Sequence, residues 1–484
     1  MWWWRGTRAA KRAGPSRALT PTGVVCAVVL TAVVLTAVVL TAGALTAIDG
    51  TAGTQAGEGT GSAPPNPRAA GAPGTARAVT GAQDASVARL QDRLGRVPGD
   101  WPAWAELGLA YVELARRTGD PTSYPRAESA FARSLALRPE GNDTALTGRA
   151  ALAAARHDFL GALRAADAAI AVNPFNATAH GVRFDALVEL GRYPEAWPAA
   201  QTAVDLRPDV ASLARVAYAY ELRGQPEPAA ETLRRVIADA TSPADAAFAY
   251  FHLGELARNR GDLDGAADAY RRGLVQDPSS VQLLVGRARV AAARGEIETA
   301  LADYRVATTR SPQPWIVAEH GELLEAVGRM DEARRQYDLV RSTAALLRAQ
   351  GVEVDVELAL FEADHGEPAT AWTALAPPAP STGPDTGLGT TPRRAGVFVD
   401  DARGWVLHRL GRDDEALASA DSALGLGLRR ALFLYHRGVV WAALGRTEAA
   451  ISDLRTALET DPHFSPLHVP RARTLLTSLE GGTR

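Results

Sequence analysis

The sequence predicts an all-α fold, an array of about ten stacked helical hairpins with one transmembrane helix before it. Three observations indicate this fold. The composition is rich in Ala and only 6% aromatic, which favours helices. From residue 84 onward the chain repeats with a period of 34 residues. Near the N-terminus, an apolar run is long enough to cross a bilayer.

The first expected element is this apolar run, residues 23–48, which contains 26 residues and no charge. At about 1.5 Å per residue, a helix of this length exceeds the ~30 Å hydrocarbon thickness of a membrane. Residues 1–22 are basic and contain no acid, so the positive-inside rule places them in the cytoplasm. The repeats would then be the extracytoplasmic part of a single-pass protein in the cell membrane.

A cleaved signal peptide is the alternative interpretation, because Ala42-Gly43-Ala44 is similar to a cleavage site. The apolar core of a signal peptide normally has only about 7 to 15 residues, which favours the uncleaved anchor. Cleavage would instead release a secreted, soluble protein. Residues 49–83 are dominated by Gly, Ala, Thr and Pro and predict a disordered linker, since they offer little apolar surface to offset the entropy of ordering.

The repeat is visible in prolines that close successive units. Pro174 and Pro208 are 34 residues apart, and so are Pro278 and Pro312. Three other residue types share this register, which makes chance a poor explanation. The same interval separates Gly261 from Gly295, Ala266 from Ala300, and Tyr270 from Tyr304.

Each unit is expected to be a hairpin of two helices. In one unit, residues 245–258 and 263–275 have apolar or small residues at helical spacing, with a break at Gly261 between them. Small residues at Gly254 and Ala266 would let the two helix axes approach closely, while large neighbours fill the space beside them. A single hairpin leaves an apolar face exposed, and stacking in rows covers that face.

The first unit most plainly resembles the tetratricopeptide repeat family, in its membrane-anchored bacterial form. That pattern has an aromatic residue, Leu-Gly and Tyr on one helix, then Ala, an aromatic residue and Pro on the next. The matching residues are Trp104, Leu107, Gly108, Tyr111, Ala127, Phe131 and Pro139. The resemblance implies a right-handed superhelical solenoid that binds protein or peptide partners on an inner surface lined by the first helices.

Three kinds of position recur in each unit and mark the register of the whole array. Two residues depart from this pattern, since Phe184 occupies a small-residue position and His157 replaces a turn glycine. The small positions on the first helices are Gly108, Ala150, Phe184, Ala217, Gly254, Ala288, Gly321, Ala359, Gly404 and Gly438. The matching alanines on the second helices are Ala127, Ala162, Ala196, Ala229, Ala266, Ala300, Ala333, Ala371, Ala416 and Ala450. The turn glycines are Gly191, Gly224, Gly261, Gly295, Gly328, Gly366, Gly411 and Gly445.

Two interruptions divide the expected array into sub-arrays. Residues 84–341 are assigned to repeats 1–7, and residues 342–394 to an irregular eighth repeat with a Pro- and Gly-rich insertion. Residues 395–484 are assigned to repeats 9–10 and a C-terminal capping helix over about 467–479.

The sequence shows no pattern that carries catalysis. Cys26, the one cysteine, lies in the apolar run, so the rest of the chain has no thiol for a disulfide, a metal or a nucleophile. The nine histidines form no tight ligand cluster, and phosphate-binding and GxSxG motifs are absent. After residue 48 there are 47 basic and 55 acidic residues, which argues against a nucleic-acid partner. We therefore expect no metal, no cofactor and no enzymatic activity.

We therefore expect the protein to be a scaffold that binds peptide or protein partners in the groove of the solenoid. Some members of the family clamp an acidic C-terminus with Lys and Asn, but no lysine follows Lys11, and Arg258 and Asn259 only partly imitate the clamp. The alternatives are a secreted binding protein, a regulatory subunit of an enzyme complex, and aromatics that only fill gaps between units. The candidate groove residues are Tyr218, Glu221, Phe248, Phe251, Glu255, Arg258, Asn259, Arg289, Trp315, Glu322, Phe398, Trp405, His408 and Tyr435.

Overall fold

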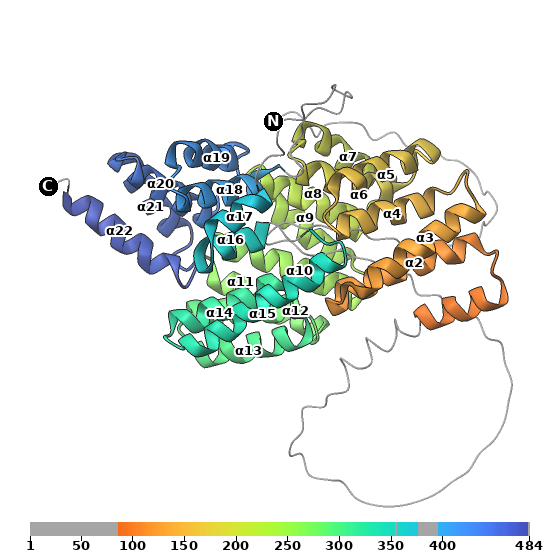
Figure 1. The fold of residues 1–484 in the computed structure, drawn as a ribbon, viewed down its shortest axis with the longest axis horizontal. Coiled ribbons are helices and arrows are strands. Elements are labelled where there is room, and N and C mark those ends of the chain that lie inside the picture. The colour runs from red at the N-terminus through yellow and green to blue at the C-terminus, as the bar shows by residue number, and fades with distance from the viewer. Residues whose placement is uncertain (1–85, 354–355, 376–394, 483–484) are drawn as a thin grey trace, which may run out of the picture.

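The computed structural model describes residues 86–353, 356–375 and 395–482. The regular elements in these ranges are helices, and one isolated bridge pairs Leu190 with Ala395 (Figure 1). The predicted all-α class is therefore confirmed. The expected membrane helix over 23–48 and the linker over 49–83 lie outside the described residues. Within the described ranges, no helix combines the length and the apolarity needed to span a bilayer.

A helix over residues 86–96 precedes the labelled elements. The helices that follow are α2 (Trp101–Thr118), η1 (Pro121–Ser123), α3 (Tyr124–Leu137), α4 (Asp143–Ala155), α5 (Phe159–Val172), α6 (Ala177–Glu189), α7 (Tyr193–Leu206), α8 (Val210–Leu222), α9 (Pro226–Asp239), α10 (Pro243–Arg258) and α11 (Leu263–Gln276). The second half contains α12 (Val281–Ala293), α13 (Ile297–Arg310), α14 (Pro314–Ala326), α15 (Met330–Ala349), α16 (Val356–His365), α17 (Pro368–Leu375), α18 (Val397–Arg409), α19 (Asp413–Gly425), α20 (Ala431–Ala443), α21 (Thr447–Thr460) and α22 (His468–Gly482).

Consecutive helices pack as hairpins, from α2 with α3 through α20 with α21. Each expected small position lies on the first helix of a pair, and each expected alanine lies on the second. Side chains at the starts of helices fix many of the boundaries. Asp262, for example, accepts a hydrogen bond from the Gly265 backbone N–H and caps α11.

Bulky rings on the second helices explain why the first helices carry glycine. A Cβ added to Gly254 on α10 would clash with the ring of Tyr270 on α11. A Cβ at Gly286, on the first helix of the next pair, would lie 2.6 Å from the same ring. Tyr270, fully buried, is therefore held between glycines of two successive units. This close packing is the contact that lets one hairpin stack on the next.

The two departures from the pattern have local solutions. Phe184 on α6 is fully buried, and Ala200 stands on α7 at the position where α3, α11, α13 and α15 carry an aromatic ring. In this pair the large side chain is therefore on the first helix, and the small one is on the second. His157 adopts φ +62°, the left-handed conformation that glycine has in the other turns. Gly366 is an exception among the expected turn glycines, because it does not have a positive φ.

The interruption around residue 342 is smaller than the sequence suggested. Helix α15 continues through residues 342–349, so the longer approach to the eighth unit is partly helical. The eighth pair, α16 and α17, contains short helices of 10 and 8 residues. The Pro- and Gly-rich insertion lies outside the described residues, in the gap between 375 and 395. Helix α22 occupies the position expected for the capping helix and packs on α21.

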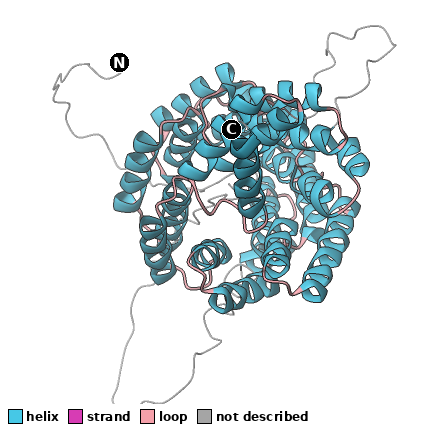
Figure 2. Ribbon diagram, turned by 90° about the vertical axis from the view of Figure 1, so that its left-hand side faces the viewer, coloured by secondary structure: helices cyan, strands magenta, loops and turns pink. Residues whose placement is uncertain are grey.

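The array curls until its later units touch its earlier ones, and the hairpins form a ring in Figure 2. We call these contacts the seam. At the seam, the turn inside each early hairpin contacts the segment just before a later hairpin. The later hairpin is always the same number of hairpins further along the chain. The contacts join Gly119 to Ser311, Arg156 to Glu353, Glu189 to Ala395, Gly224 to Gly427, and Gly261 to Thr460.

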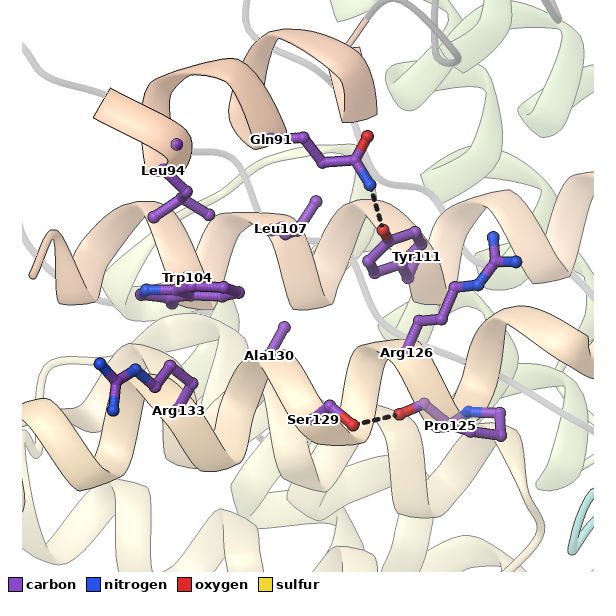
Figure 3. Close-up of a pocket in the computed structure, with 11 residues that line it drawn as sticks. Gln91, Leu94, Trp104, Leu107, Tyr111, Pro125, Arg126, Ser129, Ala130 and Arg133 are labelled. Atoms are coloured by element: carbon purple, nitrogen blue, oxygen red, sulfur yellow. Dashed lines mark hydrogen bonds between the residues drawn. The ribbon is translucent and has the colours of Figure 1, made fainter. Parts of the chain in front are cut away.

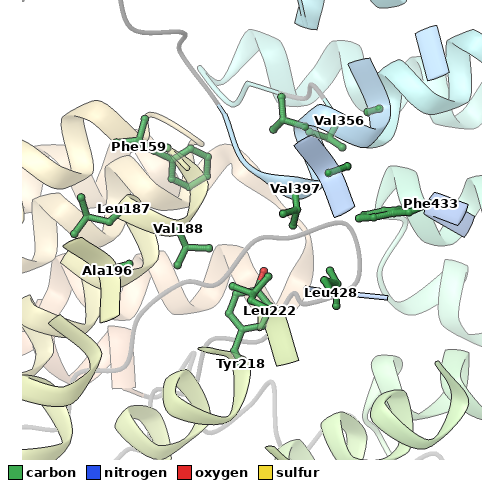
Figure 4. Packing of buried hydrophobic residues seen from close by; sticks show 14 of the residues in the cluster. Phe159, Leu187, Val188, Ala196, Tyr218, Leu222, Val356, Val397, Leu428 and Phe433 are labelled. Atoms are coloured by element: carbon green, nitrogen blue, oxygen red, sulfur yellow. The ribbon is translucent and has the colours of Figure 1, made fainter. Parts of the chain in front are cut away.

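The apolar core also crosses the seam. One cluster of buried residues joins helices α4 to α8 with helices α16 to α22. Figure 4 shows both sides of this cluster meeting. Its labelled residues are Phe159, Leu187, Val188, Ala196, Tyr218, Leu222, Val356, Val397, Leu428 and Phe433.

Candidate functional site

The ring encloses a cavity that we call the inner groove. Its volume is about 520 Å³, and its walls come from the first helices α10, α12, α14, α16, α18 and α20. The segment 461–473, which leads into α22, lines one side. The groove therefore has a wall that is built by many units, as expected for the inner surface of a solenoid.

The structure brings six of the predicted site residues together in this groove. They come from α10, the segment after it, α12, α14 and α18, which are distant in the sequence but adjacent around the ring. These six residues are Arg258, Asn259, Arg289, Trp315, Glu322 and Phe398.

The other candidates lie behind the groove surface. Tyr218, Glu221 and Phe248 surround a hollow of only about 10 Å³, so their side chains pack against each other. Phe251 and Glu255 are buried beside Tyr270. Their position on an inner helix made them candidates, but the neighbouring helix covers them.

The last three candidates belong to an aromatic cluster beneath the groove. Trp405 and Tyr435 are buried, and the Trp405 ring stacks on His436 with centroids 4.3 Å apart. The half-buried His408 pairs with Asp413 at 2.6 Å. This cluster contributes mainly to packing between α18, α20 and α22.

A network of ion pairs fixes the arginines on one wall. Arg289 bonds Glu255 through Nη1 at 3.0 Å and Glu319 through Nη2 at 2.6 Å. Arg258 bonds the same Glu255 at 3.1 Å and lies 3.8 Å from Asp461 across the seam. Burial opposes the charge of Glu255, but Arg258 and Arg289 outweigh it and lower the pKa of this carboxyl.

Aromatic side chains lie against these charges. The guanidinium of Arg289 lies 5.6 Å from the centre of the Trp315 ring, and that of Arg430 lies 5.2 Å from the centre of Phe398. Phe398 also packs edge-on against Phe433. Both Trp315 and Phe398 stay half-exposed, so their outer faces are available in the groove.

Two histidine–carboxylate pairs, which the sequence analysis did not anticipate, lie at the floor. His436 lies 3.0 Å from Asp401, and His468 lies 3.2 Å from Asp364. Burial raises the pKa of Asp364, but the hydrogen bond from His468 prevails and lowers it to about 2. Among the described residues, no group of three or more potential ligands is placed to hold a metal ion.

Sequence reasoning missed several residues of the groove. Glu319 and Glu357 both stand two positions before an expected small residue, Gly321 and Ala359, so the register could have found them. Phe464 lies in the segment between α21 and α22, where no repeat pattern applies.

A second hollow lies at the N-terminal end, between the helix over 86–96, α2 and α3. Its volume is about 650 Å³, and Trp104, Leu107 and Tyr111 line it along α2 with Arg126 and Arg133 opposite (Figure 3). None of the predicted site residues lies there. Gln91 donates a hydrogen bond to the Tyr111 hydroxyl and holds the first helix in place.

Comparison with known proteins gives a family match in two parts of the chain. The model of the tetratricopeptide repeat matches residues 147–211, 182–246, 215–281, 251–313 and 402–463. These matches cover units of the array on both sides of the eighth pair. No curated protein is significantly similar to the sequence.

Several solved structures are similar in part. A tetratricopeptide repeat protein from Parabacteroides merdae is 18% identical, covering 56% of this chain and 98% of its own, with a TM-score of 0.30. The type IV pilus biogenesis factor PilW is 17% identical over 43% of this chain and 97% of its own, with a TM-score of 0.35. The Cut9–Hcn1 structure is 12% identical over 84% of this chain and 94% of its own, with a TM-score of 0.36.

Proposed function

From the tetratricopeptide repeats that this chain contains, we propose that it is a protein-binding scaffold that holds a peptide or protein segment in its inner groove. The observation that carries this proposal is the half-exposed Trp315 and Phe398 on the groove wall. Aromatic side chains with one open face supply a large share of the energy at protein interfaces.

The groove is also prepared for binding before a partner arrives. Arg258 and Arg289 are held by two or more acidic groups each, so their side chains lose little freedom when a ligand contacts them. A surface that is ordered in advance binds more tightly because less entropy is lost on association.

Site-specific photo-cross-linking tests this proposal. A photoreactive phenylalanine analogue would replace Trp315 or Phe398 in the full-length protein in its native cell. The matched control is Val306, a 40% exposed residue on the second helix α13. Adducts at 315 and 398 but not at 306 are expected. Adducts at 306 alone, or at none of the three positions, would count against the groove.

We further propose that the segment 23–48 anchors the protein in the cell membrane, with residues 1–22 cytoplasmic and the repeats extracytoplasmic. The length of the apolar run and the basic residues before it support this orientation. Protein or peptide partners would then be met outside the cytoplasm. N-terminal sequencing of the mature protein separates this proposal from the secreted alternative, because a start near Ile48 would mean that the anchor has been removed.

A further inference from the structure

The balance of charge inside the groove points to the chemistry of its partner. We propose that the inner groove selects a segment with basic side chains spaced between apolar ones, and that Glu322 and Glu357 receive the basic groups. This inference rests on the proposed function, and it adds which kind of peptide the groove takes.

Three of the four arginines that line the groove are already neutralised by the protein itself. The fourth, Arg473, is exposed and donates a hydrogen bond to the Pro462 carbonyl. Arg258 and Arg289 share Glu255, and Arg289 also binds Glu319. Arg430 lies 3.1 Å from Glu221 across the seam. An acidic partner would have to displace these carboxylates, and breaking a buried ion pair is costly.

Within the part of the chain that the structure describes, two carboxylates on the groove surface have no arginine partner. Among the described residues, the one ion-pair contact of Glu322 on α14 is with the His365 ring, at 3.5 Å. Glu357 on α16 has no hydrogen-bond or ion-pair partner among the described residues. Both are half-buried, where the attraction of an incoming cation is screened less than at an open surface. Acidic residues also outnumber arginines in the groove lining, so the local charge favours a basic ligand.

Apolar side chains lie next to these carboxylates. Leu360 is on the same helix as Glu357, and Phe398 and Leu432 follow on α18 and α20. All three are half-buried. A segment that alternates apolar and basic residues would therefore place its apolar groups on this wall and its cations on α14 and α16.

Two synthetic peptides test the inference against the full-length protein. Both contain twelve residues with the same Leu and Trp content, and they differ only in carrying Arg or Glu at the remaining positions. Fluorescence polarisation is expected to show at least about tenfold tighter binding of the Arg peptide at low ionic strength, and a smaller difference in high salt.

Variants then locate the effect. Glu322→Gln combined with Glu357→Gln should reduce the preference for the Arg peptide by about tenfold, on the scale of desolvated charge pairs. Glu448→Gln, which removes an exposed carboxylate on the second helix α21, is the matched control and should change nothing. A thermal melt of each variant by circular dichroism establishes that it remains folded.

Three results would overturn the inference. If both peptides bind equally, the groove binds peptides without selecting charge, and the proposed function stands alone. If the Glu peptide binds more tightly, the selection has the opposite sign. If neither peptide binds, the inference fails, and the cross-linking at 315 and 398 decides separately whether the proposed function fails with it.

Discussion

At the scale of single residues, burial keeps two histidines of the array neutral. His252 packs between Phe248 and Phe251, and His320 stacks on Tyr304. Burial lowers the pKa of each to about 4. In the unfolded chain their pKa returns to about 6.5, so unfolding takes up protons between pH 4 and 6.5.

The stability of the protein should therefore fall as the pH is lowered through this window. For His252, a shift of this size corresponds to roughly 3 kcal/mol at most. Replacing His252 with Phe, which keeps a ring but does not titrate, should flatten the dependence of the unfolding free energy on pH between 4 and 6.5. Urea denaturation at several pH values measures this. An unchanged slope in His252→Phe would contradict the assignment.

A second prediction at this scale concerns the glycine that faces Tyr270. Gly254→Leu should destabilise the protein by roughly 3 kcal/mol or more, because the added atoms would occupy the volume of the ring. The control is Gly425→Leu at the end of α19, since a Cβ there meets nothing within 4 Å. Chemical denaturation compares the two. Equal stabilities would mean that α10 and α11 are not packed as described.

At the scale of elements, the seam depends on a close approach between turns. Gly224, between α8 and α9, has φ +67° and lies against the carbonyl oxygen of Gly427. Gly445, between α20 and α21, has φ +70° in the equivalent turn and nothing within 4 Å. The two glycines therefore share a backbone conformation and differ only in the seam contact.

Substituting alanine at Gly224 and at Gly445 separates the cost of the left-handed backbone conformation from the cost of disturbing the seam contact. Both substitutions should cost about 1 kcal/mol for the left-handed backbone conformation. Gly224→Ala should cost about 2 kcal/mol more, because its Cβ would push the turn away from Gly427. Hydrogen exchange of the segment before α20 should rise in Gly224→Ala and not in Gly445→Ala. Identical exchange in the two variants would argue against a packed seam.

At the scale of the whole molecule, the shared core makes the two ends of the array depend on each other. In an open solenoid each repeat contacts only its neighbours, and removing distant repeats has little effect. Here Leu187 and Leu222 on early helices belong to the same buried cluster as Val397 and Phe433 on late ones. Loss of the late helices would expose apolar surface at the other end of the chain.

A chain that ends at residue 353 tests this dependence. Its α6 and α8 amides should exchange faster than in the full-length protein, and the fragment should bind a hydrophobic dye, because part of the cluster is exposed. Exchange in α12, whose buried residues pack with α13 and α14, should change less. Unchanged protection in α6 and α8 would show that the array behaves as an open solenoid.

The sequence by itself determined the helical hairpin and its register. Gly254 and Ala266 could be placed in advance because both are set by contacts within one repeating unit, and such contacts leave a period in the chain. Six groove residues followed from the same register, since side chains on one face of successive first helices line one surface. The membrane segment and its orientation stay predictions from composition.

Only the tertiary structure decided how the array closes and which candidates stay exposed. The contact between Gly224 and Gly427 depends on small rotations between successive units that add up over many units. The spacing of residues in the sequence does not reveal this total rotation. Glu255 and Trp405 share a face with groove residues in the sequence, but neighbouring helices cover them. Exposure depends on what packs from distant parts of the chain, whereas the local pattern fixes only the direction in which a side chain points.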